Sequence, residues 1–317
     1  MNMNNSQPLF IYTYGCREEE LSLCQLEMRA FFGMDSKTNI LTSPIGINPD
    51  RSPFIRERIE VMYEGETLEH IHEQVEAIVL GESTFKVIFI KMNDLAPEAQ
   101  YSFEDKRAVE REIGIHIDAE ADVHQPDYVY GLITLGGRWY FGNLLKSKAV
   151  WLDHMKKPRS YSIALSTRDA RAIANIAVPN PQGVRAIDPC CGIGTVLVEA
   201  LSMGIDIVGS DINTLIVDGA NENLVYFGYD SKVKLEDIAD IHETYDTAII
   251  DMPYNHYSRS TPEEQLSLLQ HARRIANKVV VVTADPVDEM ITEANLHIAD
   301  RGIVRKGNFI RHIIVCT

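Results

Sequence analysis

The second half of the chain alternates short apolar runs with amphipathic stretches of helical length. The runs are rich in Val and Ile, which is typical of strands buried on both faces of a sheet. Helices between such strands, joined by right-handed crossovers, predict an open parallel sheet covered on both sides. The predicted strands are Val184 to Asp188, Ile205 to Asp211, Val233 to Ile238, Asp246 to Asp251 and Val279 to Ala284.

The C-terminal end departs from this alternation. A helix near Val287 to Ala294 is followed by two strand-like runs, Leu296 to Arg305 and Asn308 to Cys316, with only a short turn between them. So short a connection joins antiparallel strands. We therefore expect an α/β domain whose mostly parallel sheet ends in an antiparallel hairpin.

The first half has shorter elements in the order β-α-β-β-α-β, which is the ferredoxin-like order. A helix from Ser102 to about Ile113 and two alternating runs follow, and Gly136-Gly137 between the runs predicts a hairpin. The predicted elements are strands at Leu9 to Gly15, Asn39 to Ser43, Arg58 to Tyr63, Phe85 to Lys91, Tyr128 to Leu135 and Arg138 to Leu145, and helices at Leu21 to Phe32 and Leu68 to Leu80.

The length of 317 residues favours at least two domains. We place an N-terminal α+β region at residues 1–150, a basic linker at 151–165 and the α/β domain at 166–317. No apolar run reaches membrane-spanning length, and M-N-M-N-N-S-Q-P lacks the pattern of a signal peptide, so we expect a cytoplasmic protein without a membrane partner. Five cysteines show no zinc-ribbon spacing, and no metal site is predicted.

Charge is distributed unevenly along the chain. The net charge of −16 argues against indiscriminate coating of nucleic acid, and Arg56 to Asp122 alone carries 7 Lys/Arg against 17 Asp/Glu. Arg138 to Ala174 reverses this, with 8 Lys/Arg against 2 Asp and several interleaved aromatic residues. This segment is either a solvated linker or an RNA contact strip, because phosphate contact and base stacking need these residue types together. The candidate RNA-binding residues are Arg138, Lys146, Lys148, Lys156, Lys157 and Arg159.

The first predicted strand of the α/β domain runs into D-P-C-C-G-I-G-T, Asp188 to Thr195, where its glycines would let a cofactor approach the backbone. The turn lacks the third glycine of a dinucleotide fingerprint and the lysine of a P-loop. Asp211 and Asp237 end the next two strands and could accept from ribose hydroxyls and an adenine amino group, with Ile238 against the ring. Asp188 could meet an amino-acid ammonium. These acids fit S-adenosylmethionine, although each alone could be a helix cap.

The fourth predicted strand ends in D-M-P-Y, Asp251 to Tyr254. Asp251 and the carbonyl of Met252 could accept hydrogens of an exocyclic base nitrogen, so that its lone pair points at a methyl group. Pro253 would fix the turn, and Tyr254 could stack on an extruded base. A plain β-turn containing proline is the structural alternative. These four residues are the predicted catalytic residues.

These motifs resemble those of Rossmann-fold amino-methyltransferases, whose tetrapeptide is usually Asp/Asn-Pro-Pro-Tyr/Phe; methionine stands at the second position here. With V-G-S-D-I-N and the upstream K-K-P-R-S-Y-S-I-A-L-S-T-R-D-A-R, the second half is similar to the THUMP-domain tRNA guanine-N2 methyltransferases that modify guanosine 10. K-R-A-V-E-R-E-I-G and P-D-Y-V-Y-G-L-I-T-L-G-G-R-W-Y-F-G resemble the end of a THUMP domain.

The resemblance implies a class I methyltransferase domain preceded by a ferredoxin-like and THUMP RNA-binding region, with tRNA as substrate. It also implies that Thr167 lies beside the methionine end of the cofactor, and it leaves open whether a small activator subunit is required. The oligomeric state is equally open. The predicted cofactor-binding residues are Thr167, Asp188, Pro189, Cys190, Gly192, Gly194, Thr195, Asp211, Ile212, Asp237 and Ile238.

Three other functions remain in view. Adenine-N6 methylation of DNA or RNA uses the same tetrapeptide, and a nicotinamide-dependent oxidoreductase predicts binding of NAD in place of S-adenosylmethionine. A THUMP-containing RNA-binding protein with an inactive catalytic half predicts RNA binding without methyl transfer.

Overall fold

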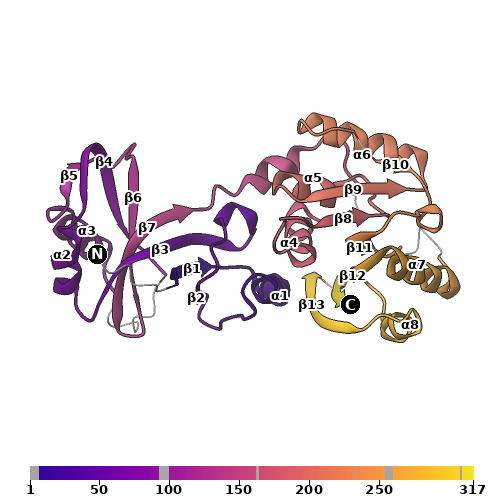
Figure 1. The fold of residues 1–317 in the computed structure, drawn as a ribbon, viewed down its shortest axis with the longest axis horizontal. Helices are drawn as coiled ribbons and strands as arrows, with labels where there is room; N and C mark the ends of the chain where they lie inside the picture. Colours follow the sequence, from indigo (N-terminus) through magenta and orange to yellow (C-terminus); the bar gives the residue numbers. More distant parts are fainter. Residues whose placement is uncertain (1–6, 93–99, 162–163, 232, 254–259, 308) are drawn as a thin grey trace. The chain divides into compact units, whose positions relative to one another are not determined.

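The computed structural model describes residues 7–92, 100–161, 164–231, 233–253, 260–307 and 309–317 (Figure 1). These residues form two compact units. The first unit contains the chain up to Gly15, Ser36–Asp50 and Ile55–Lys148, and the second contains Cys16–Asp35, Arg51–Phe54 and Ala149–Thr317. Within the described ranges, no helix is both long and apolar enough to cross a membrane.

The second unit is built on a seven-stranded sheet in the order β10-β9-β8-β11-β12-β14-β13. Strands β8 to β12 run parallel, whereas β14 pairs antiparallel with both β12 and β13. The predicted parallel sheet with a terminal antiparallel hairpin is confirmed. The strands are β8 (Arg185–Asp188), β9 (Asp206–Asp211), β10 (Lys234–Leu235), β11 (Tyr245–Asp251), β12 (Ala276–Thr283), β13 (Ile298–Lys306) and β14 (Phe309–Cys316).

Helices cover both faces of this sheet (Figure 1). Ala248 and Ile250 of β11 pack with Leu269 of α7 in one buried apolar cluster. Thr247, on the opposite face of β11, donates from Oγ1 to the carbonyl of Ala177 in α4 at 3.5 Å. Successive residues of β11 therefore point to opposite faces of the sheet and pack in two different cores. The helices are α4 (Thr167–Ala177), α5 (Thr195–Ser202), α6 (Thr214–Tyr226), α7 (Pro262–Ile275) and α8 (Asp288–Glu293), with 3-10 turns η4 (Val150–Lys156) and η5 (Ile238–Asp240).

The third predicted strand of this unit is shorter than expected. Val233 to Ile238 was predicted as strand, but pairing is confined to β10, and η5 begins at Ile238. The side chain of Asp237 caps η5 by accepting from the N–H of Ala239 at 2.9 Å. An aspartate that bonds to the backbone two residues ahead stops extended pairing.

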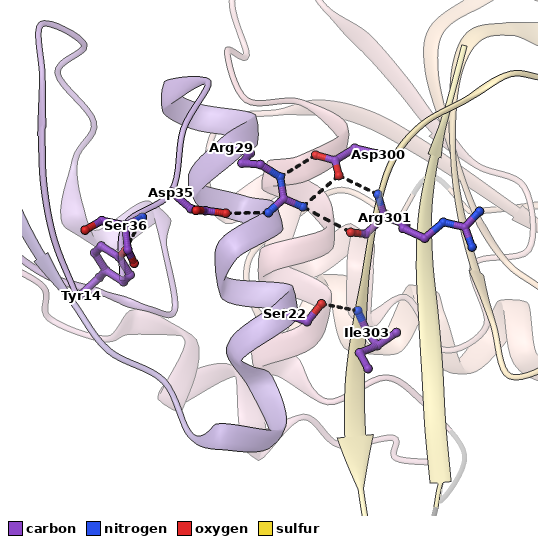
Figure 2. A network of polar contacts seen from close by, with 8 residues as sticks. All are labelled: Tyr14, Ser22, Arg29, Asp35, Ser36, Asp300, Arg301 and Ile303. Carbon is purple, nitrogen blue, oxygen red and sulfur yellow. Dashed lines mark hydrogen bonds and ion pairs between the residues drawn. The ribbon is translucent and has the colours of Figure 1, made fainter. Parts of the chain in front are cut away.

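Helix α1 (Leu21–Phe32) belongs to the second unit, where it packs on α4 and on the edge strand β13. Figure 2 shows its contacts: Arg29 donates to Asp300 from Nε at 2.8 Å, and Ser22 Oγ accepts from the N–H of Ile303 at 3.0 Å. A Cβ on Gly302 would lie only 3.0 Å from the carbonyl of Ser22. The helix thus covers an edge strand that would otherwise present unpaired backbone groups.

A buried polar cluster joins α1, residues 51–54 and α4. Glu27 is fully buried, and its carboxylate accepts from the Ser52 hydroxyl and from Asn175 Nδ2, the latter at 2.7 Å. Arg51 donates to Asn175 Oδ1 at 3.0 Å and to the carbonyl of Pro179 at 2.7 Å. These contacts place two segments of the first 150 residues with the C-terminal sheet.

The linker predicted at residues 151–165 also takes part in the second unit. His154 of η4 makes a 2.7 Å contact through Nδ1 with Oε1 of the fully buried Glu199, and Arg171 donates to Glu199 Oε2 at 2.5 Å. Residues 150–156 are therefore fastened to α4 and α5.

The first unit contains a second seven-stranded sheet in the order β2-β1-β3-β7-β6-β4-β5. The elements along the chain follow the predicted β-α-β-β-α-β order, but β1 pairs with β2 and β3 while β4 pairs with β5 and β6. The prediction of one ferredoxin-like unit from these elements is therefore wrong in its strand pairing. The predicted Gly136-Gly137 hairpin is present, joining β6 to β7.

Two apolar clusters fill this unit, one beneath α2 and α3 and one on the opposite face of the sheet. Helix α2 is shorter than predicted because residues 79 and 80 already belong to β4. The elements are β1 (Phe10–Tyr14), β2 (Ile40–Ser43), β3 (Ile55–Gly65), α2 (Leu68–Val75), β4 (Val79–Phe89), α3 (Phe103–Gly114), β5 (Asp118–Ala121), β6 (Tyr128–Leu135) and β7 (Arg138–Lys146). The described residues also include the 3-10 turns η1 (Glu18–Glu20) and η2 (Pro49–Arg51).

Candidate active site

A cavity of about 960 Å³ opens in the second unit at the carboxyl ends of the strands. It lies where the sheet order reverses, between β8 with its neighbours β9 and β10 on one side and β11 on the other. Open α/β sheets bind ligands at this switch point. The predicted residues that line it are Pro189, Cys190, Gly192, Asp211, Ile212, Asp237, Ile238, Asp251, Met252 and Pro253.

The glycine-rich turn brings backbone to the cavity wall. Gly192 and Gly194 have φ angles of +53° and +77°, in the left-handed region that favours glycine. A Cβ built on Gly192 would meet no atom within 4 Å, so this residue borders open space. On Gly194 a Cβ would lie 3.5 Å from Ala220 of α6, so there the turn approaches the packed interior.

The three predicted cofactor-binding aspartates share one local geometry. Each accepts a hydrogen bond from the backbone N–H two residues ahead: Asp188 from Cys190 at 3.2 Å, Asp211 from Asn213 at 3.0 Å, and Asp237 from Ala239 at 2.9 Å. Such bonds fix the direction of each carboxylate. The cap role and the ligand role considered from the sequence are therefore compatible, because each carboxylate has lone pairs beyond those that accept from the backbone.

Negative charge accumulates beneath the cavity. Burial raises the pKa of Asp188 well above its usual range; the Cys190 N–H opposes this shift, whereas Asp251 and Asp211 add to it. Burial, followed by the charges of Asp188 and Asp211, likewise raises the pKa of the Cys190 thiol. A cationic ligand would relieve the repulsion among these carboxylates. A neutral thiol at Cys190 offers no nucleophile for covalent chemistry.

The predicted catalytic tetrapeptide begins where β11 ends. Asp251 pairs with Val282 of β12 in the sheet, and the N–H of Met252 donates to the carbonyl of Val282 at 2.8 Å. The Met252 side chain is buried in the core beneath α7, so methionine at this position serves packing. Tyr254 lies outside the described residues.

Helix α7 holds the same loop from the other side. The Pro253 carbonyl accepts from Gln265 Nε2 at 3.3 Å and from the Ser260 hydroxyl at 3.1 Å. The helix begins with a capping box in which Thr261 Oγ1 accepts from the N–H of Glu264 at 3.2 Å and Glu264 accepts from the N–H of Thr261 at 2.8 Å. Gln265 was not singled out from the sequence.

Further wall residues also come from α7. Glu263, Glu264, Ser267 and His271 line the cavity. Ser267 and His271 follow the adjacent pair Glu263 and Glu264 at the three- or four-residue spacing of one helical face. This polar stripe is visible in the sequence, but nothing there distinguishes it from an ordinary solvated face. Among the described lining residues none is Lys or Arg, whereas five are Asp or Glu.

Four predicted cofactor-binding residues lie outside the described lining: Thr167, Asp188, Gly194 and Thr195. Thr167 is the buried first residue of α4, directly after Ser166, whose hydroxyl accepts from the N–H of Asp169 at 3.0 Å. Thr195 Oγ1 accepts from Lys157 Nζ at 2.8 Å. Asp188 is only 2 % exposed.

The predicted RNA-binding residues are divided between the units, with Arg138, Lys146 and Lys148 in the first and Lys156, Lys157 and Arg159 in the second. Lys157 is turned to Thr195, and burial lowers its pKa. Part of the positive charge is therefore balanced within the protein. The ion pairs are Arg138 with Glu64 at 3.2 Å, Lys146 with Glu57 at 3.5 Å and Arg159 with Glu222 at 2.6 Å.

The cavity belongs to a segment with known relatives. Residues 156–285 match the UPF0020 family, described as the RMKL-like methyltransferase domain. This range contains the glycine turn, the three aspartates and Asp251. It begins after the first unit, so the predicted THUMP assignment stays a prediction.

Two curated relatives are named as methyltransferases. The chain is 31 % identical over 174 residues to the tRNA (guanine(10)-N2)-dimethyltransferase of Methanothermobacter thermautotrophicus, covering 51 % of each chain. It is 35 % identical over 123 residues to the protein of the same name from Pyrococcus abyssi, covering 37 % of this chain and 36 % of the relative. The chain thus spans about half or less of the length of these relatives.

Two solved structures are similar over nearly the whole chain. They are TrmN from Thermus thermophilus, with 16 % identity, a TM-score of 0.47 and coverage of 97 % and 99 % of the two chains, and the putative methyltransferase SMU.472 complexed with SAH, with 13 % identity, a TM-score of 0.48 and coverage of 98 % of both. Likenesses at this level do not bear on function.

Proposed function

We propose that the protein is an S-adenosylmethionine-dependent RNA methyltransferase that modifies the exocyclic N2 of a guanosine in tRNA. One observation carries the proposal: a single cavity is bordered by the glycine turn after β8, by Asp211 at the end of β9, by Asp237 after β10, and by Asp251 at the end of β11. The names of the curated relatives support guanine N2 in tRNA as the acceptor.

The residues fit S-adenosylmethionine better than NAD. Gly192 borders open space, so a ligand can approach its backbone. The described lining contains no Lys or Arg to meet a pyrophosphate, and its carboxylates suit a ligand with an ammonium and a sulfonium. Asp211 would accept from the ribose hydroxyls and Asp237 from the adenine amino group. The buried Asp188, which lies outside the described lining, is proposed to accept from the ammonium.

The cavity volume of about 960 Å³ lies near the upper end of the range for small-molecule sites, roughly 300–1,000 Å³. Such a volume offers room for a cofactor together with an extruded base. Taking the base out of the stack is required before its amino group can react.

The bound cofactor would supply an electrophilic methyl group on its sulfonium. The protein's part is to hold the base: the Asp251 carboxylate and the Met252 carbonyl accept N–H hydrogens of the guanine amino group, which directs the nitrogen lone pair toward the methyl group. Pro253 keeps this backbone in place because Gln265 and Ser260 hold its carbonyl. Once nitrogen bears the extra methyl, it is a strong acid, and Asp251 can take its proton.

RNA docking is proposed for basic residues that keep their charge outward, such as the exposed Lys156. Lys157 is proposed to act indirectly, through Thr195 beside the glycine turn. The first unit is proposed as the RNA-binding region that the THUMP resemblance implies.

Calorimetry and a transfer assay test this proposal together. The protein should bind S-adenosylhomocysteine and not NAD, and should transfer labelled methyl groups to unmodified tRNA. Asp251→Ala should lower transfer by at least about 100-fold, the usual scale for a lost proton acceptor, and leave cofactor affinity largely unchanged.

Asp246→Ala, at the opposite end of β11, is the matched control and should retain transfer. Binding of NAD in place of S-adenosylhomocysteine, or full turnover by Asp251→Ala, would contradict the proposal.

A further inference from the structure

Arg274, in the last turn of α7, binds three carbonyl groups around η5. Its Nη1 donates to the carbonyl of Ile241 at 2.6 Å, and its Nη2 donates to those of Ile238 and Ala239, each at 3.0 Å. Hydrogen bonds from a charged donor are shorter and stronger than neutral ones. One side chain therefore holds nearly the whole turn.

That turn forms one wall of the cavity. Asp237, Ile238 and Ala239 all line it, and the Asp237 carboxylate takes its direction from the N–H of Ala239. A three-residue 3-10 helix has little internal hydrogen bonding, so its position depends on outside contacts. Strand β10 before it is only two residues long and adds little support.

Arg274 also contacts a residue of the cavity wall on α7. Its Nη2 lies 3.4 Å from Nδ1 of His271, one turn earlier on α7, and His271 lines the cavity. The guanidinium thus connects the α7 wall to the η5 wall. Shifting either wall would strain these contacts.

We infer that Arg274 is a positioning residue, which keeps η5 in the conformation where Asp237 and Ile238 form a preformed surface for the adenine end of the cofactor. This inference rests on the proposed function, since it assumes an adenine-containing cofactor in the cavity. Arg274 does not touch the cofactor; it acts through the carbonyls of the turn. Preorganisation of this kind increases affinity because the turn does not have to be ordered on binding.

Arg273 provides a matched control. It is the neighbouring exposed residue in the same turn of α7, and the described part of the chain gives it no hydrogen bond or ion pair. Both arginines interact favourably with the negative end of the helix dipole. Comparing Arg274→Met with Arg273→Met therefore separates the three carbonyl contacts from the general effect of a cation there.

The test measures binding of S-adenosylhomocysteine and adenosine to the full chain. Arg274→Met should weaken both at least about tenfold, or about 1.4 kcal/mol, whereas Arg273→Met should leave both unchanged. At saturating cofactor, kcat should stay near the wild-type value, since the base-binding residues are untouched. Hydrogen exchange at residues 236–242 of the unliganded protein should accelerate in Arg274→Met only.

Arg274→Lys supplies a second measurement if the methionine variant does not fold. One ammonium cannot reproduce the forked contacts, so its affinity should lie below wild type, with faster exchange at residues 236–242. Wild-type affinity and exchange in either folded variant would overturn the inference. Failure of the wild-type protein itself to bind S-adenosylhomocysteine would instead overturn the proposed function.

Discussion

The backbone N–H of Gly192 donates to Oδ2 of Asp211 at 3.1 Å and so joins the glycine turn after β8 to the end of β9. Oδ1 of the same carboxylate accepts from the N–H of Asn213 at 3.0 Å. Asp211 therefore shapes the turn before any ligand arrives. Its proposed bonds to ribose would use the remaining lone pairs of these oxygens.

Asp211→Ala should consequently weaken S-adenosylhomocysteine binding strongly. It removes charge-assisted bonds to the ribose, each contributing roughly 1.5–3 kcal/mol, and it releases the turn. We expect a loss of more than about 100-fold by calorimetry. Asp206→Ala, at the amino end of the same strand, should bind normally. Equal losses in the two variants would show that the effect is general to β9.

Cofactor affinity should rise with pH through the titration of Asp188. Burial raises the pKa of this carboxyl, so at low pH the group is neutral and cannot pair with an ammonium. Binding of the cation then expels a proton, and affinity increases by at most about tenfold per pH unit until the carboxylate is ionised without ligand. Calorimetry in buffers of different ionisation enthalpy should detect proton release.

Asp188→Asn should bind more weakly and lose this pH dependence, while Asp206→Asn keeps it. A wild-type affinity that is flat with pH would contradict the assigned role of Asp188.

Gln265→Ala should reduce kcat about tenfold with little change in cofactor affinity. The variant loses the hydrogen bond to the Pro253 carbonyl, so the loop that holds the base can shift. Small displacements of positioned groups lower the reaction rate strongly. Single-turnover methyl transfer and calorimetry separate the two effects. Gln270→Ala, exposed on the same helix, is the control. A changed affinity with unchanged kcat would assign Gln265 to the cofactor instead of the base.

Glu27 should make the protein less stable as pH rises. Burial raises its pKa to about 7, and bonds from Ser52 and Asn175 and the charges of Arg51 and Arg171 only partly offset this shift. The unfolded state ionises near the ordinary value of 4.5, so stability present below that pH is lost as pH rises through about 7. The loss should be on the order of 3 kcal/mol.

Urea unfolding of wild type and Glu27→Gln at pH 4.5 and pH 8 measures this pH-dependent loss of stability. The variant should gain stability relative to wild type at the higher pH, whereas Glu19→Gln, at an exposed position, should not. A wild-type-to-variant difference that is the same at both pH values would show that Glu27 does not titrate in this range.

The sequence predicted the C-terminal fold well because most of its strands are apolar and alternate with helices. Ala248 and Ile250 of β11 and Val281 of β12 are buried in one apolar cluster, as expected for residues on one face of neighbouring strands. It predicted the ends of short elements less well. Val233 to Ile238 has strand-forming residues, yet the cap made by Asp237 terminates pairing.

Long-range packing was the part that local pattern could not supply. The apolar face of α1 is evident, but its burial against β13 depends on contacts of Arg29 with Asp300 and on the small Gly302, which lie far from α1 in the chain. The hydrogen bond between Asn175 and Glu27 likewise joins residues that are far apart in the chain. Strand pairing in the first unit was mispredicted for this reason, since the order of elements does not determine which edges meet.

Within the candidate site, the sequence indicated acids that end strands and missed the residues that hold them in place. Asp211, Asp237 and Asp251 stand at or near the ends of runs predicted as strands, which is a local signal. Gln265 and Arg274 act through backbone carbonyls of distant loops, and that role leaves no motif.

Mass spectrometry of nucleosides from unmodified tRNA, incubated with the protein and S-adenosylmethionine carrying a labelled methyl group, tests the central claim most directly. We predict that the label appears in N2-methylguanosine or N2,N2-dimethylguanosine, and that Asp251→Ala abolishes it. Label in a methyladenosine, or no labelled nucleoside from a folded protein that binds the cofactor, would contradict the account.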